Sequence, residues 1–239
     1  MTLTLLPAVP IPQTLPHAPL APPHRPVTRP APRVDGWTLL WLALFFGVLA
    51  WSGWRPKDRL TWLLEVAPAL AGLVALAVTR RRFPLTPLSY WLILGFSFVL
   101  MVGGKYTYAQ VPLGDWVSAW LGWPRNNYDK LGHFLQGFVP GLVAREVLLR
   151  LRVVNGRGWL YFVVVCFALA LSATYELVEW AAALLSAEAA QAFLGTQGYV
   201  WDTQSDMFMA LVGVNVGLLT LAGVQDRQIA RLEGGGRHA

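Results

Sequence analysis

Charged residues are scarce in this chain. Asp, Glu, Lys and Arg make up only 13% of its 239 residues, whereas hydrophobic residues make up 55%. Soluble globular domains carry about a quarter charged residues, and the mean hydropathy of +0.46 also lies on the apolar side. The composition therefore excludes an ordinary soluble domain and predicts an integral membrane protein.

Cysteine is almost absent as well. Cys166 is the single cysteine, so no intramolecular disulfide can form. It lies in an apolar run between Val165 and Phe167. A thiol in such a run is expected to be a small buried packing residue. The chain also lacks Gly-x-Ser-x-Gly, His-Glu-x-x-His and a phosphatase-type Arg/His set, so no nucleophile motif names a reaction.

Long apolar runs are what the sequence has instead. Six of them approach the roughly 20 residues that a helix needs to cross the hydrocarbon of a bilayer. They cover residues 37–54, 60–79, 85–103, 130–149, 159–185 and 206–224. We therefore predict an all-α fold, a polytopic membrane bundle of six transmembrane helices. The connection over residues 105–128 contains three Trp residues and is expected to hold a short helix on the membrane surface.

Three segments follow from this division. Residues 1–36 are rich in Pro and are expected to form a disordered tail. Residues 37–225 are predicted to form the six-helix membrane domain, and residues 226–239 a short cytoplasmic tail.

The basic residues predict the orientation, because an even number of spans leaves both termini on one side. The connection over residues 186–205, on the opposite side, contains no Lys or Arg. The terminal side carries Arg25, Arg29, Arg33, Arg80, Arg81, Arg82, Arg150, Arg152, Arg157, Arg227 and Arg231, against Arg55, Lys57, Arg59, Lys105, Arg125 and Lys130 on the other. Both termini are therefore expected in the cytoplasm. Clusters between apolar runs suit loops beside anionic lipid, so the net charge of +6 does not indicate a nucleic-acid partner.

Most polar residues of the spans gather at one depth on the outer side. They are Glu65, Asp129, His133, Gln136, Glu176, Glu179, Asp202 and Asp206. Those on one helix are three or four residues apart, so each set projects from a single face. A charged residue at the centre of a lipid-facing helix costs about 2.5–3.5 kcal/mol. We therefore expect these side chains to converge in a common pocket.

Two further patterns accompany this cluster. On the last span, the face of Asp206 continues through Met209, Gly213 and Gly217, a small-residue pattern that allows close approach of a neighbouring helix. Arg145 and Glu146 lie near the cytoplasmic end and are expected to snorkel or to pair locally.

Negative charge is in excess in the outer cluster. Its six carboxylates face only Lys105, Arg125, Lys130 and at most a protonated His133. Either a carboxyl group keeps its proton there, or a cation binds.

Purely structural interpretations stay open at this point. Asp129, Asp202 and Asp206 could stabilise helix N-termini, and His133 taken alone could be a hydrogen-bonded packing residue. Glu176 and Glu179 are harder to explain in this way, because they lie inside an otherwise apolar helix.

Three segments carry a resemblance to a known family. They are NNYDKLGHFLQGF over residues 126–138, ATYELVEW over 173–180 and LGTQGYVWDTQSDM over 194–207. These segments resemble the signature blocks of the YjdF family, bacterial inner-membrane proteins of unknown function, and the likeness covers roughly residues 37–224. The resemblance implies a multi-pass protein of the bacterial inner (cytoplasmic) membrane and supplies no established reaction.

A more distant resemblance is to the VanZ-like families, one of which is linked to glycopeptide tolerance. It rests on Asp-Lys-x-x-His at the start of one helix, a Glu within the membrane and an Asp at the start of the last helix. The chain departs from that pattern in two places. The usual Glu-x-x-Gln is here Glu176-x-x-Glu179, and the loop before Asp202 is longer.

Two hypotheses of different class follow for function. In the first, the protein is an envelope enzyme that acts on a lipid-linked or other envelope substrate in the outer leaflet. His133, Glu176 and Glu179 would then be catalytic residues or ligands, and Asp129, Asp202 and Asp206 would hold a divalent cation. The substrate would be bound by Asn127, Lys130, Gln136 and Gln204. In the second, a non-catalytic carrier or binding protein uses the same carboxylates for a cation, a proton-coupled solute or a lipid head group.

Overall fold

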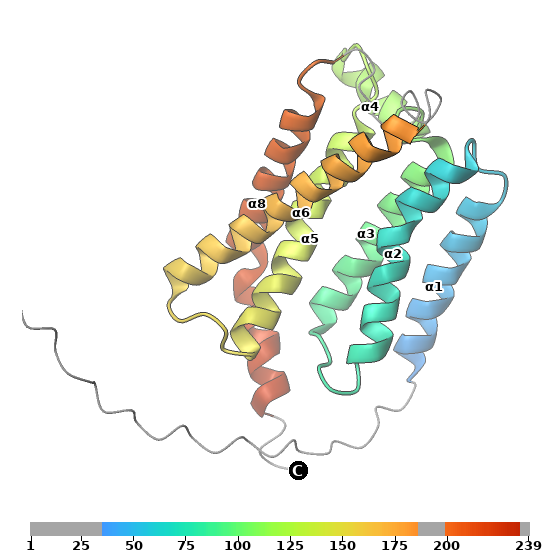
Figure 1. The fold of residues 1–239 in the computed structure, drawn as a ribbon. Coiled ribbons are helices and arrows are strands. Elements are labelled where there is room, and N and C mark those ends of the chain that lie inside the picture. The colour runs from blue at the N-terminus through green and yellow to red at the C-terminus, as the bar shows by residue number, and fades with distance from the viewer. Residues whose placement is uncertain (1–34, 186–198, 235–239) are drawn as a thin grey trace, which may run out of the picture. The chain divides into compact units, whose positions relative to one another are not determined.

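The computed structural model describes residues 35–185 and 199–234, and every regular element in these two ranges is an α-helix (Figure 1). The helices are α1 (Gly36–Gly53), α2 (Arg59–Thr79), α3 (Pro87–Tyr106), α4 (Pro112–Leu121), α5 (Tyr128–Arg150), α6 (Arg157–Leu185) and α8 (Asp202–Gly234). The predicted all-α membrane bundle is thereby confirmed. The tail predicted over residues 1–36 lies almost wholly outside the described residues.

Successive long helices run in alternating directions through the bundle (Figure 1). Five of them, α1, α2, α3, α6 and α8, are long and apolar enough to cross a membrane. The remaining one, α5, has 23 residues and carries acidic and basic side chains near both of its ends. It packs against α3, α6 and α8, so protein surrounds much of its surface. The count of six spans therefore depends on α5, and it stays a prediction.

Helix boundaries lie close to the predicted ones, with one exception. The last predicted span ends at Val224, whereas α8 continues to Gly234 and so includes most of the stretch predicted as a cytoplasmic tail. α1 begins and α8 ends at the same end of the bundle (Figure 1), as an even number of spans requires.

The short surface helix expected before the fourth span is α4. It lies at one end of the bundle, which we call the α4 end (Figure 1). Trp116 and Trp120 expose 77% and 84% of their surface, and with Leu113 they recur at helical spacing on one face. An exposed face rich in Trp suits the interface between lipid and water.

Side-chain caps fix the starts of the first three helices. Asp35, Asp58 and Thr86 each accept a hydrogen bond from the backbone N–H three residues ahead. Each bond satisfies one of the free N–H groups at a helix N-terminus. In α3 the cap is followed directly by Pro87, whose fixed φ suits the first helical position.

Removing the cap of α2 is expected to cause a pH-dependent loss of stability. The N–H of Thr61 donates to Asp58 Oδ1 at 2.7 Å, and this bond holds the pKa of Asp58 below its ordinary value of 3.8. Asp58→Ala should lower the free energy of unfolding by about 0.5–2 kcal/mol near neutral pH. The contribution of the Asp58 carboxylate to the free energy of unfolding is complete above pH 3.8. It is lost as the pH falls through the lower pKa that Asp58 has in the folded state. Thermal unfolding in detergent checks this, and an equal penalty in strong acid would contradict it.

Glycines allow α5 and α8 to approach closely. A Cβ added to Gly213 of α8 would lie 1.9 Å from the carbonyl oxygen of Phe134, and one added to Gly137 of α5 would lie 1.9 Å from that of Ala210. The predicted small-residue face of the last span therefore packs against α5. This contact holds together the two helices that carry His133 and Asp206.

A buried polar network joins α3, α5 and α8 at the end opposite α4. Glu146 has no exposed surface and accepts hydrogen bonds from Arg150 and from the first turn of α3. Arg145 is also buried and donates to Gln225 and Asp226 of α8. The expected local pairing is confirmed for Glu146, which pairs with Arg150 one turn further on, whereas Arg145 pairs across to α8. Both side chains are buried, so neither snorkels to the surface.

Cys166 does not lie where the sequence suggested. Its side chain is exposed on α6, as are those of Phe162 and Phe167 nearby. The prediction of a buried packing thiol is wrong, because an apolar run predicts a span without predicting which side of the helix meets its neighbours.

Candidate functional site

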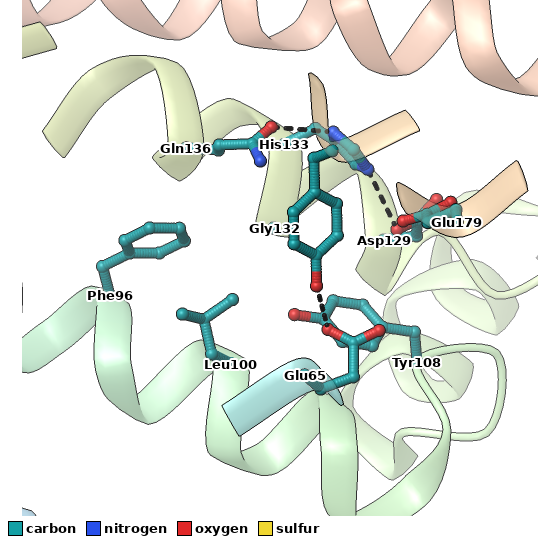
Figure 2. Close-up of a pocket in the computed structure, with 10 residues that line it drawn as sticks. Glu65, Phe96, Leu100, Tyr108, Asp129, Gly132, His133, Gln136 and Glu179 are labelled. Carbon is teal, nitrogen blue, oxygen red and sulfur yellow. Dashed lines mark hydrogen bonds and ion pairs between the residues drawn. The ribbon is translucent and has the colours of Figure 1, made fainter. Parts of the chain in front are cut away.

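A small cavity lies within the bundle towards the α4 end. Its wall is formed by residues of α2, α3, α5, α6 and the connection between α3 and α4. They are Glu65, Phe96, Leu100, Tyr108, Asp129, Gly132, His133, Gln136, Tyr175 and Glu179 (Figure 2). The volume open to the centre of a water-sized sphere is about 20 Å³. Since one water needs about 10–15 Å³ by this measure, the cavity admits a water molecule or a metal ion and is too small for a lipid head group.

His133 of α5 is the central side chain of the site. Its Nδ1 lies 3.1 Å from Oε1 of Gln136. An amide oxygen can only accept a hydrogen bond, so Nδ1 carries a proton, and in a neutral ring Nε2 then presents a lone pair. That Nε2 lies 3.5 Å from Asp129 Oδ1 and 3.5 Å from Glu176 Oε1. A lone pair that faces two carboxylate oxygens is repelled by them unless a proton or a metal ion lies between.

Glu176 of α6 contributes a carboxylate oxygen without a hydrogen-bond donor. Its side chain is only 8% exposed, and Oε1 has no hydrogen-bond partner within the described residues. A buried polar atom left unpaired costs free energy and calls for an explanation. Because this oxygen faces Nε2 of His133, the missing partner belongs in the space between the two atoms.

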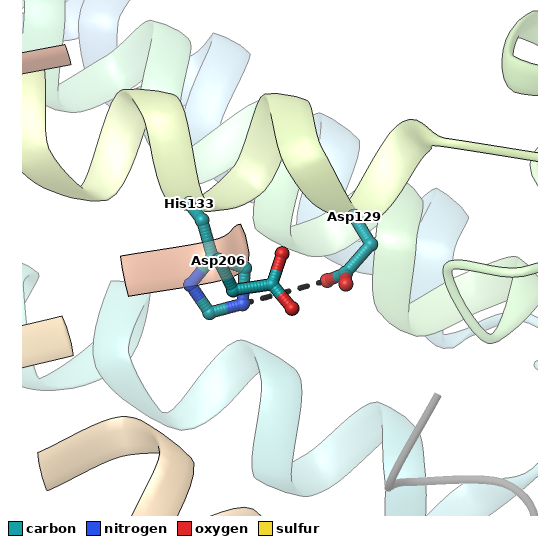
Figure 3. Close-up of side chains that lie close together, drawn as sticks. All are labelled: Asp129, His133 and Asp206. Atoms are coloured by element: carbon teal, nitrogen blue, oxygen red, sulfur yellow. Dashed lines mark ion pairs between the residues drawn. The ribbon is translucent and has the colours of Figure 1, made fainter. Parts of the chain in front are cut away.

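Two overlapping groups of three side chains meet at His133. One, which we call the glutamate set, consists of His133, Glu176 and Glu179. The other, the aspartate set, consists of Asp129, His133 and Asp206 (Figure 3). In each set the three ligand atoms lie within 4.8 Å of one another. The polar faces of α5, α6 and α8 thus converge.

Glu65 forms the far side of the cavity. The hydroxyl of Tyr175 donates to Glu65 Oε2 at 2.9 Å and so connects α6 to α2. The ring of Tyr175 also packs edge-on against His133, with ring centroids 6.3 Å apart. Sequence reasoning missed Tyr175, although a signal existed: it precedes Glu179 by four residues and therefore lies on the same helical face.

Tyr108 closes the cavity from the connection between α3 and α4. Two glycines make room for its ring, since a Cβ on Gly103 or Gly132 would lie 2.2 Å or 2.9 Å from ring atoms. Burial raises the pKa of the Tyr108 hydroxyl well above its usual value, so the group stays protonated. Nothing in the sequence pointed to this residue, because a position in a connection has no helical periodicity.

Ion pairs border the site at the start of α8. Asp202 Oδ1 accepts from Arg125 at 2.6 Å and from Lys130 at 2.8 Å. Lys130 also donates to Asp206 at 2.6 Å. Asp202, predicted as a metal ligand, therefore lies outside both ligand sets and holds the two cations in place.

The remaining predicted residues lie away from the cavity wall. Asn127 exchanges two hydrogen bonds with Arg125 in the connection before α5, and Gln204 is exposed on α8. Lys105 was expected among the acids, but it donates to the carbonyl groups of Trp51 and Trp54 at the end of α1.

The charge imbalance predicted for the outer cluster is greater in the structure. Lys105 no longer counts as a counter-ion, so Arg125 and Lys130 are the two permanent cations paired with these acids in the described part of the chain. The six carboxylates are Glu65, Asp129, Glu176, Glu179, Asp202 and Asp206. A buried excess of negative charge requires protons or a bound cation.

Comparison with known proteins places this arrangement in a family. The family model described as "Predicted membrane protein (DUF2238)" matches residues 37–227. The chain belongs to this family. It is 54% identical over 184 residues to the inner membrane protein YjdF of Escherichia coli (strain K12), a match that covers 77% of this chain and 88% of that protein.

The predicted likeness to the YjdF family is confirmed, and the chain is a multi-pass protein of the inner membrane. No solved structure matches it. The name of the Escherichia coli relative states a location and no activity.

Proposed function

We propose that this protein binds a divalent metal ion beside His133, which lines the cavity. The observation that carries the proposal is the 3.5 Å distance between Nε2 of His133 and an unpartnered, buried carboxylate oxygen of Glu176. With a neutral ring and an ionised carboxylate, neither atom can satisfy the other, since both offer only lone pairs. A cation placed between them would satisfy both.

Distances support a metal ion in this position. Tetrahedral coordination with bonds of roughly 2.0–2.2 Å places neighbouring ligand atoms about 3.3–3.6 Å apart. Nε2 of His133 lies 3.5 Å from an oxygen of Asp129 and from one of Glu176. Gln136 accepts the Nδ1 proton of the ring and so supports the orientation of His133, as partners behind metal-bound histidines do.

The donor set favours a particular class of metal. One imidazole with two carboxylates suits Zn²⁺, Fe²⁺ or Mn²⁺, whereas Mg²⁺ and Ca²⁺ prefer oxygen ligands throughout. Three protein ligands would leave a fourth position for water.

Cavity size favours the binding hypothesis over the enzyme hypothesis. A volume of about 20 Å³ accepts an ion, whereas a lipid-linked substrate could enter only after the helices moved apart. With the expected cytoplasmic termini, the α4 end faces the periplasm, and the ion would enter from that side.

Metal content of the purified protein tests the proposal. After removal of metal with a chelator and incubation with Zn²⁺ or Mn²⁺, the wild type should retain about one ion per chain. His133→Ala and Glu176→Gln should each retain less than about a tenth of that amount, because each removes a ligand. Elemental analysis by mass spectrometry after desalting measures the retained ion.

Glu233→Gln is the matched control. It removes an exposed carboxylate from the opposite end of α8 and should leave the metal content unchanged. A wild type that retains no Zn²⁺, Fe²⁺ or Mn²⁺, or ligand variants that retain as much as the control, would overturn the proposal.

A further inference from the structure

Lys130 occupies one of the two ligand sets. Its ammonium group lies 2.6 Å from Asp206 Oδ1 and 2.8 Å from Asp202 Oδ1. All three side chains are mostly buried, with 16% of Lys130, 4% of Asp206 and 6% of Asp202 exposed. The aspartate set therefore already holds a positive charge of the protein's own.

The glutamate set differs in this respect. Glu179 is half-buried on α6, and Glu176 Oε1 has no hydrogen-bond partner among the described residues. Neither glutamate forms a salt bridge with Lys or Arg in the part of the chain that the structure describes. Both sets share His133, so an ion bound there completes its coordination from one set or the other.

We infer that Lys130 directs the metal to the glutamate set by keeping Asp206 engaged. This inference rests on the proposed function. An ammonium group cannot coordinate a metal and repels it at short range. A metal bound to Asp206 would lie close to this ammonium group, so Lys130 disfavours Asp206 as a ligand and thereby lowers the affinity of the site.

A comparison with Arg125 separates this specific effect of Lys130 from a general effect of positive charge near the site. Arg125 also pairs with Asp202, at 2.6 Å, but forms no salt bridge with Asp206. Loss of Lys130 would leave Asp202 with one cation and would free Asp206. Loss of Arg125 would leave the bond between Lys130 and Asp206 in place.

The experiment measures the dissociation constant for Mn²⁺ by equilibrium dialysis in detergent at fixed pH and ionic strength. Lys130→Gln should bind about tenfold more tightly than the wild type, because it frees one more anionic ligand. Asp206→Asn should stay within about twofold of the wild type, since Asp206 is not a ligand while Lys130 holds it. The double variant should lose the gain of Lys130→Gln, which a double-mutant cycle reports as coupling.

Lys130→Arg and Arg125→Gln are the controls, and both should stay within about twofold of the wild type. If Lys130→Gln is not monodisperse, the comparison of Asp206→Asn with Glu176→Gln still tests the inference. Equal loss of Mn²⁺ in those two variants would show that Asp206 is already a ligand and would overturn it. Unchanged affinity in folded Lys130→Gln would overturn the inference alone, whereas a wild type without bound metal would overturn the proposed function as well.

Discussion

Gly213→Ala is expected to destabilise the bundle by about 1–3 kcal/mol, the usual cost of overpacking. The added Cβ would lie 1.9 Å from the carbonyl oxygen of Phe134 and 3.1 Å from the backbone nitrogen of Phe138. These neighbours are backbone atoms of α5 and cannot rotate away, so α5 and α8 must move apart. The expected result is a lower melting temperature in detergent and a smaller monodisperse fraction.

Gly223→Ala is the matched control on the same helix. No atom lies within 4 Å of the Cβ position at Gly223, and the residue is exposed. Alanine favours the helix over glycine by about 1 kcal/mol, so this substitution should leave the melting temperature unchanged or raise it. Gly137→Ala makes the reciprocal test, since its Cβ would lie 1.9 Å from the carbonyl oxygen of Ala210. Equal melting temperatures for Gly213→Ala and Gly223→Ala would contradict the close packing of α8 against α5.

Spacing along single helices was the most informative signal in the sequence. It placed Asp129, His133 and Gln136 on one face of α5, and the structure joins them through Nδ1 and Nε2 of the ring. The energetic cost of lipid-exposed charge then predicted that this face would meet those of Glu176 and Asp206.

Contacts between helices could not be predicted in the same way. Tyr175 meets Glu65 only because α6 lies across from α2 at this depth, and the spacing within α6 contains no information about α2. Lys105 of α3 was expected among the acids because of its depth, but its ammonium group donates to carbonyl groups at the end of α1. Depth and helical face are local properties, whereas the partner of a face depends on how all the helices pack.

The partners of Glu146 also depend on how the helices pack, because most of them lie at the start of α3. Its carboxylate accepts hydrogen bonds from the N–H and hydroxyl of Thr86, both at 2.8 Å, from Ser89 at 2.6 Å and from Arg150 at 2.9 Å. Glu146→Ala would leave these donors buried, including the charged guanidinium of Arg150. Breaking a buried ion pair costs about 3–5 kcal/mol, so the variant should unfold at a much lower temperature or fail to accumulate.

Asp226→Ala separates this network from an ordinary ion pair at the same end of the bundle. Asp226 pairs with Arg145 at 2.7 Å, but its side chain is 56% exposed, and such pairs contribute about 0–1 kcal/mol. Its melting temperature should therefore lie close to that of the wild type. Glu146→Ala protein that does fold should still retain metal, because the network ties α3 to α5 at the end opposite the cavity. A melting temperature for Glu146→Ala within a degree or so of Asp226→Ala would show that α3 is held to α5 by apolar packing alone.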